Sequence, residues 1–95
     1  MSGLKLNTPK RRLRFETHGS SSAMDWRVFD ADSGENLSGR IGLEWTAKFA
    51  KANVGDSFYF TLYVLGPDRR PVVNWDKPES RIVRERVHAL IVERT

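Results

Sequence analysis

The sequence predicts one small α+β domain built around an antiparallel sheet of about five strands. Three observations support this fold class. The chain of 95 residues has room for a single domain with a modest core. Short segments that alternate polar and apolar residues, as half-buried strands do, are separated by residues that form turns. One segment in the middle of the chain and one at its C-terminus have the spacing and end signals of helices.

The first two predicted strands lie on either side of a serine-rich loop. Residues 12–17 alternate polar and apolar side chains, and residues 25–30 have the composition of a second strand. The loop between them contains Ser20, Ser21 and Ser22, which is typical of a flexible connection. Residues 31–35 form the next predicted turn, in which Gly34 is free to adopt a positive φ angle.

Residues 37–49 show the cleanest alternation in the chain, because their odd positions are apolar apart from one glycine and their even positions are mostly polar. This pattern predicts a third strand that ends near Trp45. A longer helix here would be apolar on two opposite sides, which a small domain can hardly cover. We therefore expect only a short helix over residues 47–53, with Thr46 as its cap and Gly55 at its end.

Residues 58–65 are aromatic and β-branched, so they predict a strand near the centre of the sheet. The turn-forming residues 66–70 follow, and residues 71–75 then predict the returning strand of a hairpin. The largest apolar side chains of these strands should be substantially buried, namely Trp45, Phe58, Phe60, Leu62 and Trp75.

The C-terminal segment, residues 77–94, supports two interpretations. Asp76 followed by Glu79 is a helix-start signal, and Val83, Val87 and Ile91 recur at helical spacing. The many β-branched residues favour a strand instead. We predict a helix and leave the strand open. The order β-β-β-α-β-β then fits a sheet with helices on it, and it equally fits a small, partly open barrel.

The positive charge is concentrated near the N-terminus. Residues 1–14 contain five basic residues and no acid, whereas the rest of the chain is almost neutral. We therefore divide the chain into a flexible basic arm, residues 1–9, and a single domain, residues 10–95. A basic arm beside a near-neutral body is a pattern that binds phosphates, and it is equally a pattern of a solvated terminus.

Several classes of site are excluded by composition. The chain has no cysteine, so disulfides, thiolate metal sites and cysteine nucleophiles are absent. Its two histidines are too few for a zinc site, and the acidic segment 30–35 lacks the ligand spacing of a calcium loop. No phosphate loop and no poised acid–base pair is visible. We expect a protein that is not an enzyme and needs neither a cofactor nor a metal.

The chain has no apolar run of membrane-spanning length, and its first residues lack the apolar core of a secretory signal. We therefore expect a cytoplasmic protein that does not associate with membranes.

The remaining signal is basic residues interleaved with aromatic ones. Tyr59 and Tyr63 share one face of their strand, where aromatic rings can stack nucleobases unless the C-terminal segment covers them. The sequence thus predicts a nucleic-acid-binding module, either for DNA or for RNA. The predicted contact residues are Lys10, Arg11, Arg12, Arg14, Arg27, Tyr59, Tyr63, Arg69 and Arg70.

The alternative is a protein–protein interaction module, such as an inhibitor or adaptor. It would bind through a sheet edge or through the acidic hairpin near residues 30–35. The oligomeric state stays open.

Overall fold

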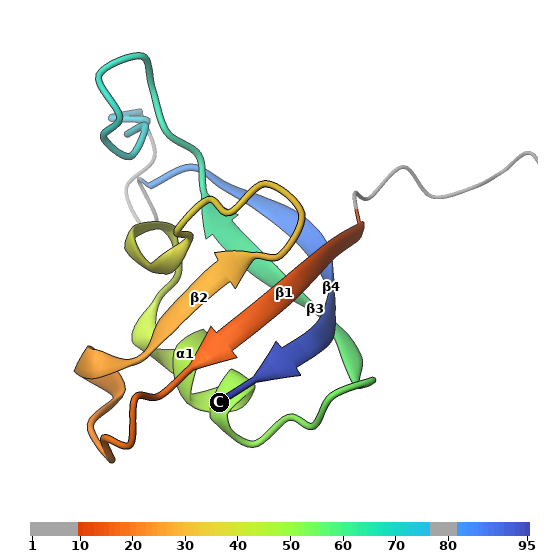
Figure 1. The fold of residues 1–95 in the computed structure, drawn as a ribbon. Helices are drawn as coiled ribbons and strands as arrows, with labels where there is room; N and C mark the ends of the chain where they lie inside the picture. Colours follow the sequence, from red (N-terminus) through yellow and green to blue (C-terminus); the bar gives the residue numbers. More distant parts are fainter. Residues whose placement is uncertain (1–9, 77–81) are drawn as a thin grey trace, which may run out of the picture.

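The computed structural model describes residues 10–76 and 82–95, so the predicted arm, residues 1–9, lies outside the described residues. The described chain forms a four-stranded sheet with one α-helix on one side (Figure 1). The strands follow the spatial order β2-β1-β4-β3. The elements are β1 (Lys10–Glu16), a 3₁₀ turn η1 (Ala23–Asp25), β2 (Arg27–Asp30), a 3₁₀ turn η2 (Ser38–Arg40), α1 (Leu43–Ala50), β3 (Ser57–Tyr63) and β4 (Arg84–Arg94).

Three strands agree closely with the segments that alternation predicts. The strands β1, β2 and β3 lie within or close to the predicted segments 12–17, 25–30 and 58–65. β1 pairs with β2 in antiparallel fashion, with Phe15 opposite Val28, and both side chains are buried. The turn after β2 contains Gly34 at φ 79°, the positive φ angle that the sequence requires there.

The C-terminal helix is a wrong prediction, because residues 84–94 form β4. β4 lies between β1 and β3, parallel to the first and antiparallel to the second, so the sheet is mixed and not purely antiparallel. Val87, Ala89 and Ile91 are buried and lie at every second position of β4. The segment thus follows the period of two that a strand requires, and not the helical spacing that the sequence also contains. Residues 77–81 of the predicted helix lie outside the described residues.

The predicted strand over residues 37–45 is also wrong. The turn η2 and the first turn of α1 occupy this segment, and α1 begins four residues earlier than the predicted helix over 47–53. The apparent alternation arises because Leu37 and Ile41 both point into the core from η2 and its flanks, whereas Leu43 is 57% exposed on the first turn of α1.

Residues 71–75 do not form the predicted fifth strand. Among the described residues, isolated bridges join Leu65 to Pro71 and Val73 to Ile82. Pro71 has no N–H and cannot donate to a ladder with Leu65. Trp75 is 77% exposed, which contradicts its predicted burial. Phe60 and Leu62 are buried as predicted, whereas Trp45 and Phe58 are only partly buried against the core. The sheet is open, with β2 and β3 at its edges, so the partly open five-stranded barrel is not formed.

The core lies on the side of the sheet that α1 covers. Phe49 of α1 is fully buried, and its ring centre lies 5.0 Å from that of Phe58 and 5.2 Å from that of Phe60. Strong twist carries β3 behind β1 in Figure 1, so that the strands curl around this core. The core residues are Leu13, Phe15, Val28, Leu37, Ile41, Phe49, Ala52, Phe60, Leu62, Val87, Ala89 and Ile91.

Candidate functional site

The sheet face opposite α1, called the outer face below, carries the side chains that alternate with the core residues. In the described part of the chain no helix or strand packs on it (Figure 1). One half of it is formed by β4 and the edge strand β3, which pair in antiparallel register. The facing residues are Tyr63 with Arg84, Thr61 with Arg86, and Tyr59 with His88.

Aromatic and cationic groups of β3 and β4 stack on one another. The rings of Tyr59 and His88 are nearly parallel, at 13°, with their centres 4.7 Å apart. The guanidinium carbon of Arg86 also lies 4.7 Å from the centre of the Tyr59 ring, and that of Arg84 lies 5.3 Å from the centre of the Tyr63 ring. These contacts hold two planar guanidinium groups on the surface. Among the described residues, neither group has an ion-pair partner.

β1 adds further positive charge to the outer face. Lys10 lies opposite His88 and Arg12 lies opposite Leu90 in the parallel register with β4. Arg12 forms a 2.6 Å ion pair with Asp32, and both side chains are more than half exposed. Arg14 is paired with Glu16 at 2.8 Å, and its guanidinium lies 4.5 Å from the centre of the Phe29 ring.

Arg11 points to the other side of the sheet, where it neutralises a buried carboxylate. Its Nη1 lies 2.9 Å from Oδ2 of Asp30. Burial alone would raise the pKa of Asp30. The hydrogen bonds from the backbone N–H groups of Ser33 and Asp32 and from the Arg11 guanidinium lower this pKa by more than burial raises it, so the pKa lies below its ordinary value. The structure therefore does not bring Arg11 to the outer face.

The other predicted contact residues lie away from β3 and β4. Arg27, on the edge strand β2, donates its guanidinium N–H groups to the backbone carbonyls of Met24 and Trp26. Arg69 and Arg70 are exposed in a turn beyond the end of β3, which Gly66 closes by donating its N–H to the carbonyl of Arg70. These three arginines are not part of the Tyr59–Tyr63 cluster.

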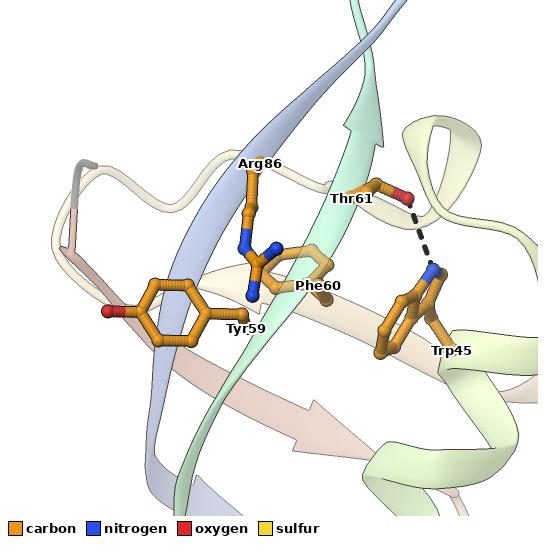
Figure 2. Close-up of a pocket in the computed structure, with 5 residues that line it drawn as sticks. All are labelled: Trp45, Tyr59, Phe60, Thr61 and Arg86. Atoms are coloured by element: carbon orange, nitrogen blue, oxygen red, sulfur yellow. Dashed lines mark hydrogen bonds between the residues drawn. The ribbon is translucent and has the colours of Figure 1, made fainter.

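A pocket opens at the edge of β3 beside the outer face (Figure 2). Trp45, Tyr59, Phe60, Thr61 and Arg86 line about 280 Å³ of space, counting the solvent at its mouth. The indole Nε1 of Trp45 donates a 3.1 Å hydrogen bond to Oγ1 of Thr61. Trp45 comes from α1 whereas Thr61 belongs to the outer face, so the indole wraps around the edge of β3. Figure 2 shows Trp45 on one side of β3, Tyr59 and Arg86 on the other, and Phe60 between them.

The acidic hairpin, the edge of β2 and part of the edge of β3 are engaged by the protein itself. Asp32 pairs with Arg12, and Glu35 lies 3.1 Å from Nη1 of Arg40. Residues 35–37 bond along the edge of β2, where Leu37 donates its N–H to the carbonyl of Val28. Arg40 reaches the opposite edge and donates to the carbonyl of Tyr63 and to Glu85.

Sequence reasoning missed Arg84, Arg86 and His88, because it placed them on a helix. The signal was available, since these residues alternate with Glu85, Val87 and Ala89, and the strand alternative would have put them on one face. In residues 10–76 and 82–95, no three His, Cys, Asp or Glu side chains are grouped to hold a metal ion. No helix among those residues has the length and apolar character to cross a membrane.

Comparisons with protein-family models, with curated proteins and with solved structures found no match to this chain.

Proposed function

We propose that this protein is a non-enzymatic module that binds single-stranded nucleic acid on the outer face of its sheet. The observation that carries the proposal is the pair of clusters Tyr59–His88–Arg86 and Tyr63–Arg84 on a sheet face that no described helix or strand covers. The same chemistry suits DNA and RNA, because both supply phosphates and unpaired bases.

The outer face carries groups that can bind the phosphates of a single strand and groups that can stack on its bases. The guanidinium groups of Arg84 and Arg86 attract phosphates, and their flat faces also accept stacked bases. Tyr59 is already stacked on His88, so a base either displaces a neighbour from the ring or stacks on the outward side of a guanidinium. A paired duplex hides its bases within its own stack, which favours single strands here.

β1 extends the binding surface beside β4. Lys10 and Arg12 lie next to His88 and Leu90, so they continue the positive charge across the sheet. The exposed pair of Arg12 with Asp32 is worth at most about 1 kcal/mol, so a phosphate competes for this arginine. Arg11 is left out of the proposed contact set, because it pairs with Asp30 on the core side.

The alternative, a protein-interaction module, has less support. The acidic groups of the hairpin near residues 30–35 are paired with Arg11, Arg12 and Arg40, so little free negative charge is left for a partner. Residues 35–37 occupy the edge of β2, and Arg40 and Trp45 cover part of the edge of β3.

A titration of a fluorescent single-stranded oligonucleotide at several salt concentrations tests the proposal. We expect binding that weakens with salt, and Arg84→Gln or Arg86→Gln should each lower the slope of log affinity against log salt by about 0.7. Lys51→Gln is the matched control, because Lys51 is an exposed cation at the end of α1, on the covered side of the sheet. If the unmodified protein does not bind at low salt, the proposal fails and the protein-interaction module becomes the leading function.

A further inference from the structure

We infer that the pocket between Trp45 and Tyr59 receives one unpaired base of the strand that lies on the outer face. This inference rests on the proposed function. It names the site at which the protein would bind a base and not only the phosphates of the strand. The pocket shares Tyr59 and Arg86 with the outer face, so a strand bound across that face passes its mouth.

The walls of the pocket suit a flat aromatic ligand. The indole of Trp45 supplies the aromatic wall on the side of α1, and Arg86 and Tyr59 line the pocket from the other side of β3, with Phe60 between (Figure 2). The hydrogen bond from the indole to Thr61 and the edge-to-face contact with Phe60, with ring centres 6.2 Å apart, fix the orientation of the indole. A base that enters meets a preformed surface and orders little protein.

The backbone of β3 supplies polar groups at the same place. Val64 donates its N–H to the carbonyl of Val83, so the antiparallel alternation directs the N–H and C=O groups of Leu62 and Phe60 toward β4. The N–H and C=O groups of Tyr59 and Thr61 consequently face the free edge. In the described residues these backbone groups have no hydrogen-bond partner, and those of Tyr59 lie on the part of the edge that Trp45 leaves open. An adjacent donor and acceptor is the pattern that the pairing edge of a base complements.

Two cations flank the pocket, where the phosphates on either side of an inserted base would pass. Arg86 lies at the outer face, and Nζ of Lys48 lies 5.3 Å from the centre of the Trp45 ring on the side of α1. An extended peptide fits less well, because a new strand needs a continuous free edge. Trp45 covers this edge at Thr61, and Arg40 already bonds to the carbonyl of Tyr63.

The test compares two ligands and uses Trp45 as the reporter. Trp26→Phe combined with Trp75→Phe leaves Trp45 as the one tryptophan of the chain, and circular dichroism checks that this variant folds. The ligands are a short oligothymidylate and a strand of equal length in which abasic sites replace the bases. We expect oligothymidylate to quench the Trp45 emission and the abasic strand to leave it unchanged.

The unmodified protein gives an independent readout with the same two strands. The abasic strand should bind at least about fivefold more weakly at every salt concentration, with the same salt slope, because it loses stacking and keeps its phosphates. Thr61→Val, which removes the acceptor that orients the indole, should weaken oligothymidylate binding and leave abasic-strand binding unchanged. Ser57→Ala, at an exposed position of the same strand, is the matched control and should change neither affinity.

The outcomes separate this inference from the proposed function. If oligothymidylate binds but leaves the Trp45 emission unchanged, the pocket is not the base site, whether or not the abasic strand binds more weakly, and the proposed function stands. Equal affinity for the two strands likewise overturns the inference, and it reduces the proposed function to phosphate binding on the outer face. If neither strand binds at low salt, the proposed function itself fails.

Discussion

Arg11 and Asp30 form an ion pair on the core side of the sheet, with Nη1 of the arginine 2.9 Å from Oδ2 of the aspartate. Asp30 also accepts the backbone N–H groups of Asp32 and Ser33, so it anchors the turn that follows β2. This pair stabilises the fold and takes one arginine of the N-terminal basic cluster away from any ligand.

The first prediction concerns the pH dependence of this pair. Because the pKa of Asp30 is lowered in the folded protein, the stabilisation it gives is present above the ordinary aspartate pKa and is lost as the pH falls through the folded pKa. Asp30→Asn should therefore reduce the free energy of unfolding by about 1 kcal/mol at pH 7, with the difference from the unmodified protein shrinking in acid. Urea denaturation at a series of pH values measures this, and a pH-independent difference would speak against the pair.

The second prediction concerns the junction of β4 with α1. Arg94 donates from Nη1 to the carbonyl of Ala50 at 3.0 Å and to the carbonyl of Ala52, so it satisfies acceptors at the helix end. Arg94→Ala should lower the free energy of unfolding by about 1–3 kcal/mol, because these partly buried acceptors lose their donor. Arg84→Ala is the control, since Arg84 is exposed on the outer face, and it should change stability much less.

The third prediction separates the two large aromatic residues that the sequence places in the core. Phe60 is 1% exposed and Trp75 is 77% exposed. Phe60→Ala should cost about 3–5 kcal/mol, whereas Trp75→Ala should stay within about 0.5 kcal/mol of the unmodified protein. Thermal melts of both variants decide this, and a comparable loss for Trp75→Ala would mean that the segment at 71–75 packs more tightly than the structure shows.

The strands β1, β2 and β3 were predictable because each shows a period of two without a competing helical pattern. Residues 84–94 satisfy both periods, since Val87 and Ile91 are four apart and also share a strand face with Ala89. Sequence patterns alone do not show that β1 and β3 lie on the two sides of this segment, and those two ladders decide in favour of a strand.

The candidate site was predictable in part for the same reason. The alternation of β3 predicts that Tyr59 and Tyr63 share the outer face. That Arg84, Arg86 and His88 lie beside them can be predicted only if residues 84–94 are known to form a strand. The basic residues at 10–14 suggest a single binding element when only their sequence is considered. In a strand, however, successive side chains point to opposite faces, so Lys10 and Arg12 point to the outer face and Arg11 points to Asp30 on the core face.

The fourth prediction concerns backbone protection. β4 is bonded to β1 on one side and to β3 on the other, so the amides of Val87 and Ala89 should be among the slowest to exchange in native-state hydrogen exchange. The amides of residues 68–70, at exposed positions of the turn after β3, should exchange much faster. Fast exchange throughout residues 84–94 would contradict the central position of β4.

The central claim, that the outer face binds single-stranded nucleic acid, is tested most directly by mapping amide chemical-shift changes during a titration with a short single-stranded oligonucleotide. We expect the largest shifts at Tyr59, Tyr63, Arg84, Arg86 and His88, with smaller ones at Lys10 and Arg12 on β1. The amide chemical shifts of α1, apart from those around Trp45, should not change. Saturable shifts concentrated elsewhere, on the distal residues of α1 or on the turn at 31–35, would contradict the claim.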